Sequence, residues 1–118
     1  MIQELNWETA GGFYRGQVEL QNPSLRGKPL FPDMNSAYPL CIAKEGSEDI
    51  IRDPMYITDA DEVRVLSDVA ENSVMYLAHG NRETLIEAAR EAADTCPTPF
   101  NAEVCFVSDC YSRVLMLG

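Results

Sequence analysis

The sequence has little positive charge. It holds 9 lysines and arginines against 19 aspartates and glutamates, which gives a formal net charge of −10 and a pI near 4.3. Nucleic-acid backbones and anionic membrane surfaces both attract clustered basic side chains. The composition therefore argues against nucleic acid and against a membrane surface as partners.

Long apolar runs are also missing. No stretch approaches the ~18 consecutive apolar residues of a transmembrane helix. The first residues, Met1 to Leu5, lack the basic and apolar regions of a signal peptide. Asn22-Pro23-Ser24 is not a glycosylation acceptor, because a proline occupies its middle position. We therefore expect a cytoplasmic protein.

Metal-binding residues are scarce. His79 is the only histidine, and the four cysteines show no Cys-x-x-Cys spacing (Cys41, Cys96, Cys105 and Cys110). Three of these cysteines lie in or beside apolar runs, where a free cysteine behaves as a small hydrophobic residue. Without a secretion signal, we expect reduced thiols. The sequence predicts no metal site and no cofactor.

The 118 residues are expected to form one domain, in which the hydrophobic periodicity is weak at the N-terminus and clear after it. Residues 1–36 contain several glycines and prolines and are predicted to be irregular, apart from a short strand within residues 13–20. In residues 37–118 the apolar residues recur at the spacings of strands and of a helix. The chain stops in an apolar run at Gly118, whereas natural termini are usually polar. We therefore expect residues 37–118 to be a domain truncated at its C-terminus.

The sequence pattern of residues 37–118 predicts several strands and one main helix. The helix is expected over about 81–95, because Asn81 is a good N-cap, Pro97 ends the pattern, and Leu85, Ile86 and four alanines form an apolar stripe. The strands are expected at residues 37–43, 49–52, 55–58, 63–66, 73–78 and 102–108. The predicted fold class is α+β, with a mixed, mostly antiparallel sheet of about five or six strands.

The order of strand 73–78, helix 81–95 and strand 102–108 predicts a βαβ unit. Parallel strands in such a unit end at the same edge of the sheet, where ligands collect near helix N-termini. The free amides after Asn81 and the guanidinium of Arg113 would favour an anionic group such as a carboxylate. The predicted ligand-binding residues are Arg113, Cys110, Ser112, Asp109, His79 and Asn81.

Three of these residues also have a structural interpretation. Arg113 is then a partner of Asp109 or of another carboxylate, Cys110 is a packed thiol, and His79 is a solvent-exposed turn residue. The acidic surplus between residues 45 and 71 is interpreted as a solvated surface.

Several segments of the chain resemble the C-terminal domain of FIST (F-box and intracellular signal transduction) proteins. They are Tyr38 to Ile42, Arg52-Asp53-Pro54, Glu71 to Val74, and Cys110-x-x-Arg113 followed by Leu117-Gly118. Together they cover roughly residues 37–118. The pattern departs from the family at Asn72, where members carry glycine. Members also have an N-terminal FIST half before this region and continue beyond Leu-Gly, so we expect a pocket shared between halves to be incomplete.

The resemblance implies a sensory, signal-transduction domain without catalysis that binds a small ligand such as an amino acid. Its expected partners are the FIST N-terminal half or joined signalling domains. A protein-recruitment module is one alternative. An enzyme with Cys110 as nucleophile and His79 as base is another. Because a single helix would leave one face of the sheet uncovered, we also expect a homo-oligomer.

Overall fold

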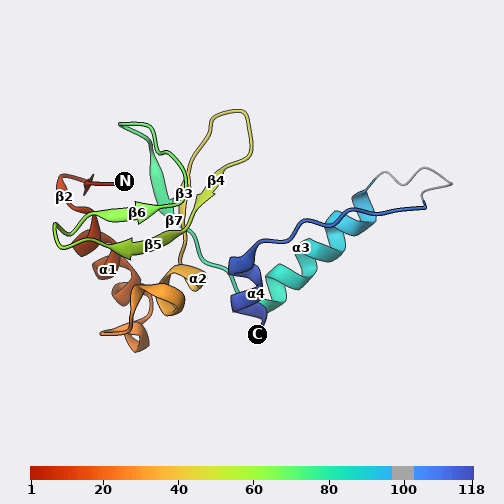
Figure 1. Cartoon of the computed structure of the whole chain (residues 1–118), viewed down its shortest axis with the longest axis horizontal. Coiled ribbons are helices and arrows are strands. Elements are labelled where there is room, and N and C mark those ends of the chain that lie inside the picture. The colour runs from red at the N-terminus through yellow and green to blue at the C-terminus, as the bar shows by residue number, and fades with distance from the viewer. Residues whose placement is uncertain (97–102) are drawn as a thin grey trace. The chain divides into compact units, whose positions relative to one another are not determined.

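The computed structural model describes residues 1–96 and 103–118, and the chain forms two compact units within it (Figure 1). Unit 1 comprises Met1–His79 and unit 2 comprises Gly80–Gly118. All strands of the described residues belong to unit 1, and the regular structure described in unit 2 is helical. None of the described helices has the length and apolar content needed to span a membrane.

The strands of unit 1 form three small antiparallel sheets. In the first, β1 (Glu4–Leu5) pairs with β2 (Glu8–Thr9). The largest has the order β4-β3-β7, with β3 (Leu40–Ile42) between β4 (Ile50–Arg52) and β7 (Met75–Leu77). The third pairs β5 (Pro54–Ile57) with β6 (Val63–Val65). The α+β class is thus confirmed, whereas the prediction of one sheet of five or six strands is wrong, because the strands are only two to four residues long and are divided among three separate sheets.

Two of the turns next to these strands place an aspartate or an asparagine in the left-handed backbone region. Asp61, between β5 and β6, has φ of 60°, and Asn72, before β7, has φ of 61°. Asparagine and aspartate adopt this conformation more readily than other non-glycine residues. Asn72 therefore serves the turn that a glycine would serve at the same position.

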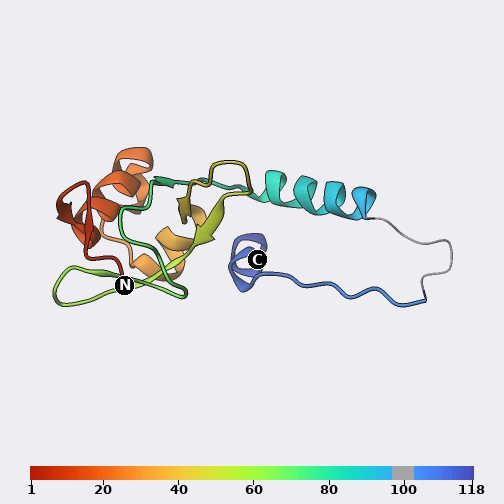
Figure 2. The ribbon, with the colours of Figure 1, turned by 90° about the horizontal axis from the view of Figure 1, so that it is seen from above.

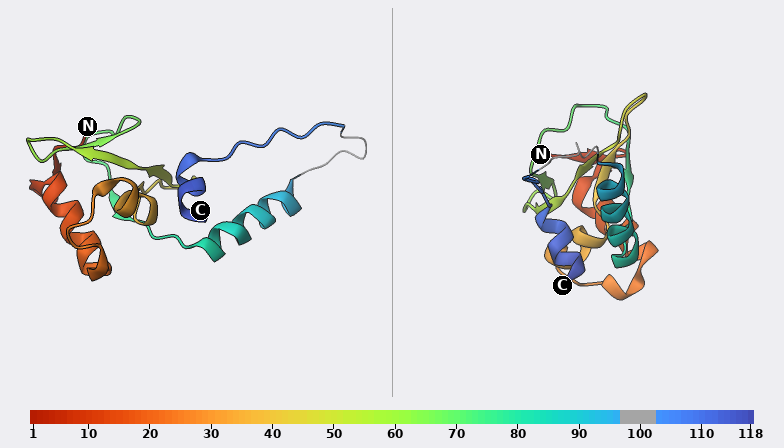
Figure 3. Two further views of the ribbon diagram at one scale, coloured as in Figure 1. Left: turned by 60° about the horizontal axis from the view of Figure 1, so that its bottom comes forward. Right: turned by 90° about the vertical axis from the view of Figure 1, so that its right-hand side faces the viewer.

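Helix α1 (Ala10–Gln21) occupies the region where the sequence predicts a strand, so that prediction is wrong. Its buried side chains, Ala10, Tyr14 and Val18, recur every four residues and form one face of a helix. Figure 3 shows α1 next to the β5–β6 hairpin. Two short helical segments, η1 (Pro23–Leu25) and η2 (Leu30–Met34), and helix α2 (Asn35–Ala37) lead from α1 to β3.

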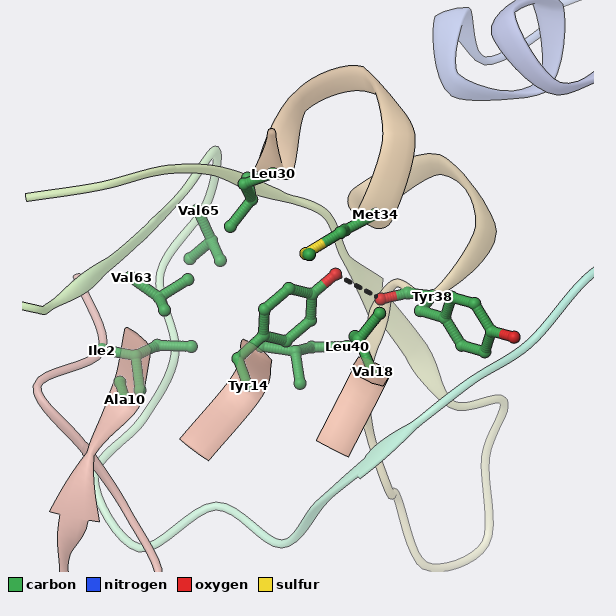
Figure 4. Packing of buried hydrophobic residues seen from close by; sticks show 10 residues of the cluster. All are labelled: Ile2, Ala10, Tyr14, Val18, Leu30, Met34, Tyr38, Leu40, Val63 and Val65. Atoms are coloured by element: carbon green, nitrogen blue, oxygen red, sulfur yellow. Dashed lines mark hydrogen bonds between the residues drawn. The ribbon is translucent and has the colours of Figure 1, made fainter. Parts of the chain in front are cut away.

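The core of unit 1 lies between helix α1 and the strands (Figure 4). Tyr14 is only 1% exposed, and its hydroxyl donates a 2.8 Å hydrogen bond to the carbonyl oxygen of Tyr38. Burial raises the pKa of Tyr14, with a smaller contribution from the negative charge of Asp53. The cluster contains ten buried residues: Ile2, Ala10, Tyr14, Val18, Leu30, Met34, Tyr38, Leu40, Val63 and Val65.

Unit 2 contains helices α3 (Arg82–Thr95) and α4 (Tyr111–Leu117). Helix α3 confirms the predicted helix, and its N-cap is the predicted Asn81. Asn81 Oδ1 accepts a 2.9 Å hydrogen bond from Thr84 N, while Asn81 N donates to Thr84 Oγ1 at 3.2 Å, which is a complete capping box. None of the described residues of unit 2 is buried.

The predicted strand 102–108 does not form within the described residues. Residues 103–110 are extended and exposed, and they run into α4 without pairing in a ladder (Figure 2). Residue 102 lies outside the described residues. A strand requires a neighbouring strand for its backbone hydrogen bonds, and no such partner is paired with these residues. The βαβ unit is therefore absent from the described residues.

Candidate functional site

Arg113, the residue that the sequence favours as a ligand anchor, lies on the first turn of α4 and interacts within unit 2. Its Nε is 2.8 Å from Oδ1 of Asp109, and its Nη2 donates a 3.1 Å hydrogen bond to the carbonyl oxygen of Leu85. The same Asp109 oxygen accepts the backbone N–H of Cys110 at 3.0 Å. The structural interpretation of Arg113 as a partner of Asp109 is thus confirmed, and ligand binding by these residues stays a prediction.

The other predicted residues divide between the two units. Asn81 caps helix α3, while Cys110 and Ser112 lie at the start of α4, with Cys110 exposed and Ser112 partly buried. His79 belongs to unit 1, where its exposed ring stacks on the buried ring of Tyr38 with centroids 4.8 Å apart. Asp109, Cys110 and Arg113 are therefore brought together on one helix end, whereas His79 has a different neighbour.

Unit 1 contains a cleft that the sequence did not predict. Its volume is about 340 Å³. Its walls come from η2, β5, β6 and the residue after β6, and its lining residues are Phe31, Met55, Tyr56, Arg64, Val65 and Leu66. Concave, mostly apolar hollows of ~300–1,000 Å³ with a few polar groups are the usual form of small-molecule sites. This cleft, called the Arg64 cleft below, has the size and composition of such a site.

Arg64 is the only charged residue among the described residues that line the cleft. Among residues 1–96 and 103–118, no hydrogen-bond or ion-pair partner accompanies its guanidinium, although Arg15, Arg26, Arg90 and Arg113 each pair with a carboxylate. A chain with a net charge of −10 offers many carboxylates to a cation. The guanidinium of Arg64 is therefore available to an anion that enters the cleft.

Strand register places Arg64 beside an aromatic side chain. Tyr56 of β5 and Arg64 of β6 are directly opposite each other in the antiparallel ladder, so their side chains leave the hairpin on the same face. Val63 and Val65, the neighbours of Arg64 in β6, are 0% and 3% exposed and belong to the core. The alternation of valine, arginine and valine in β6 was the sequence signal that could have identified Arg64 as a residue of the outer face.

A second, smaller hollow of about 190 Å³ lies between α1 and the strands. Its lining consists of Leu5, Asn6, Phe13, Tyr14, Gln17, Leu40, Met75, Tyr76 and Leu77. The lining residues carry no charge. It is suited to a neutral group rather than to a carboxylate.

One carboxylate of unit 1, Asp49, has structural partners of its own. Asp49 accepts hydrogen bonds from the backbone N–H of Lys44 and, at 2.7 Å, from the hydroxyl of Tyr76, and both bonds lower the pKa of Asp49. Hydrogen bonds to Cys41 and Asp49 raise the pKa of Tyr76. These groups join β7 to the β3–β4 hairpin. Among the described residues, no cluster of histidine, cysteine and carboxylate side chains has the form of a metal site.

The fold and the cleft define a small, acidic α+β domain with a ligand-sized hollow on its larger unit. The family model of the FIST C domain matches residues 13–118, and the chain belongs to this family. The resemblance noted in the sequence is thereby confirmed, and the match also includes helix α1. Family membership indicates a sensory domain of signal transduction. No curated protein and no solved structure matches the chain.

Proposed function

We propose that this protein is a signal-transduction sensory domain that binds a small carboxylate ligand, such as an amino acid, in the Arg64 cleft. The observation that carries the proposal is the guanidinium of Arg64, which has no partner among the described residues and lines an otherwise apolar hollow. Arginine presents parallel N–H donors that match the two oxygens of a carboxylate. The acidic surplus of the chain makes a small anion a better candidate than a nucleic acid, because the repulsion of one carboxylate is offset locally by Arg64.

A thermal-shift experiment with carboxylates tests this proposal. A ligand at 100 times its dissociation constant raises the stability of the folded state by about 2.7 kcal/mol. We expect small carboxylates to raise the melting temperature of the unaltered chain, and Arg64→Gln to abolish this rise. Arg90→Gln is the matched control, because it removes the same charge from an exposed position of α3. A rise that survives in Arg64→Gln contradicts the proposal.

Arg113→Gln separates the proposed site from the one that the sequence predicts. The guanidinium of Arg113 already contacts Asp109 and Leu85, so a ligand carboxylate would compete with Asp109. We therefore expect Arg113→Gln to keep the ligand-induced rise in melting temperature. If Arg113→Gln abolishes the rise and Arg64→Gln keeps it, the ligand site is at Arg113.

Protein recruitment is a second candidate function, and a specific observation favours it. Unit 2 exposes large apolar side chains along residues 103–107, with Phe106 95% and Val107 84% exposed. Exposed apolar clusters mark surfaces that associate with other proteins. The candidate occupants are a second copy, a joined signalling domain or the FIST N-terminal half. Sedimentation of the isolated chain tests self-association: we expect a concentration-dependent oligomer, and a monomer at high concentration removes the second copy from this list.

A further inference from the structure

We propose that the Arg64 cleft selects aromatic acids, so that its ligand is a small molecule with one aromatic ring and one carboxylate. This inference rests on the proposed function and adds the chemical class of the ligand. It comes from the walls of the cleft rather than from Arg64 alone.

The walls of the cleft expose three large apolar side chains to solvent. Phe31 is 42%, Tyr56 is 55% and Leu66 is 77% exposed, although all three are large apolar side chains. Scattered apolar residues are normal on a protein surface. Three around one hollow form an exposed apolar patch, and such patches are typical of binding sites. A ligand with an apolar body would remove this surface from water.

Two of these side chains are aromatic and come from separate elements. Phe31 lies in η2, where its backbone is extended with φ of −109° and ψ of 132°, and Tyr56 lies in β5. Aromatic rings pack against other rings in offset or edge-to-face arrangements that add to the energy of simple burial. An aromatic ligand therefore gains ring-to-ring packing energy from Phe31 and from Tyr56, whereas an aliphatic ligand of equal size gains only burial.

Arg64 fixes the orientation of such a ligand. Because Arg64 and Tyr56 leave the hairpin on the same face, an aromatic ring against Tyr56 places a short side chain of the ligand within reach of the guanidinium. The guanidinium also stacks on aromatic faces. The volume of about 340 Å³ is at the small end of ligand sites, which favours one ring over a larger cofactor.

The experiment compares phenylacetate with cyclohexylacetate, acetate and 2-phenylethanol by NMR titration of the ¹⁵N-labelled whole chain. The two ring acids share the carboxylate and have similar size, so their difference reports aromaticity. We expect phenylacetate to bind roughly tenfold more tightly than cyclohexylacetate. We also expect it to shift the backbone resonances of Tyr56, Arg64 and Leu66. Acetate has the carboxylate without the ring, and 2-phenylethanol has the ring without the charge. Both should bind more weakly than phenylacetate.

Two variants connect the selectivity to its residues. Tyr56→Leu keeps an apolar wall without the ring, and we expect it to remove the preference for phenylacetate over cyclohexylacetate. Arg64→Lys keeps the positive charge but removes the planar guanidinium with its two parallel N–H donors. We expect it to weaken the binding of both ring acids to a similar extent. Both side chains are exposed, so the variants leave the core unchanged, and their melting temperatures check this. Arg90→Gln is again the control and should bind like the unaltered chain.

The possible failures are distinguishable. Equal affinity for the two ring acids, lost in Arg64→Gln, overturns the aromatic selectivity and leaves the proposed carboxylate site intact. Resonance shifts that leave Tyr56 and Arg64 unaffected overturn the proposed function as well. A short peptide with a C-terminal phenylalanine that binds more tightly than phenylacetate identifies a peptide terminus as the occupant and overturns the small-molecule ligand.

Discussion

Unit 1 and unit 2 are stabilised in different ways. Unit 1 buries ten residues in one apolar cluster, whereas none of the described residues of unit 2 is buried. Burial of apolar surface is the dominant favourable contribution to folding, and a helix cap contributes only about 1 kcal/mol. Unit 1 therefore has the interactions of a cooperative domain, while the helices of unit 2 are held by a helix cap and by polar contacts such as that between Arg113 and Leu85.

The same difference bears on the location of a ligand site. A binding residue must be held in place by elements that do not move when the ligand arrives. Arg64 lies between the buried Val63 and Val65 of β6, whereas Arg113 lies on a seven-residue helix without buried residues. The Arg64 cleft is therefore part of the more rigid unit.

The largest expected effect comes from truncating a methionine in the core. Met34 is 1% exposed, so Met34→Ala leaves a cavity and should lower the free energy of unfolding by about 2–5 kcal/mol. Met116→Ala in the partly exposed α4 is the matched variant and should cost well below about 1 kcal/mol. Urea unfolding of both variants measures the difference. Equal losses would show that unit 2 packs as tightly as unit 1.

A smaller effect is expected where helix α1 approaches the β5–β6 turn. A Cβ atom at Gly11 would lie 2.7 Å from Cγ2 of Ile57, so Gly11→Ala should destabilise unit 1 by about 1–3 kcal/mol. Gly16, in the same helix, has no atom within 4 Å of the corresponding position. Gly16→Ala should therefore stabilise the helix by about 0.5–1 kcal/mol. Chemical unfolding of the two variants should show opposite signs, and a shared sign contradicts the packing of α1.

In unit 2 the expected effect is local. Asn81→Ala removes the capping box of α3 and should cost about 1 kcal/mol of helix stability. Because α3 has no buried residue, this loss should reduce the helical circular dichroism signal without moving the unfolding midpoint of unit 1. A midpoint that shifts together with the helical signal would contradict the separation of the two units.

The smallest effect concerns a carboxylate that caps helix α1 from a distant turn. Asp61 Oδ2 accepts hydrogen bonds from the hydroxyl of Thr9 and, at 2.9 Å, from the N–H of Gly12. The Thr9 bond is the main cause of a lowered pKa of Asp61, with help from Gly12 and Arg15. A lowered pKa in the folded state stabilises the fold above the unfolded pKa of about 4, and this stability is lost as the pH falls through the folded pKa.

Two substitutions test this cap. Both Asp61→Asn and Thr9→Val should flatten the decline of stability below about pH 4, measured by thermal unfolding at several pH values. An unchanged acid decline in both variants would show that Asp61 does not contribute to it.

Local signals were sufficient to predict much of the fold from the sequence. The capping pattern at Asn81 identified α3, and the apolar strands with their polar turns identified β3 to β7. Helix α1 was missed because its three glycines lower helix propensity. The four-residue spacing of Ala10, Tyr14 and Val18 was the correct signal.

The remaining differences depend on tertiary structure. Residues 103–108 have the composition of a strand, but composition does not supply the neighbouring strand that a ladder needs. Arg64 could not be distinguished by type from the other arginines. Its proposed role rests on the lack of a partner among the described residues and on the walls of the cleft, which form only when η2 lies beside the β5–β6 hairpin.

Amide hydrogen exchange of the whole chain tests most directly the claim that unit 1 alone has a cooperative core. Amides of α1 and β3 should exchange only through global unfolding, while those of α3 and α4 should exchange many times faster, since few buried contacts protect them. Mass spectrometry of peptides from the two units measures both sets in one sample. Equal protection of α1 and α3 would contradict the account, because it would place unit 2 in the same cooperative unit as the core.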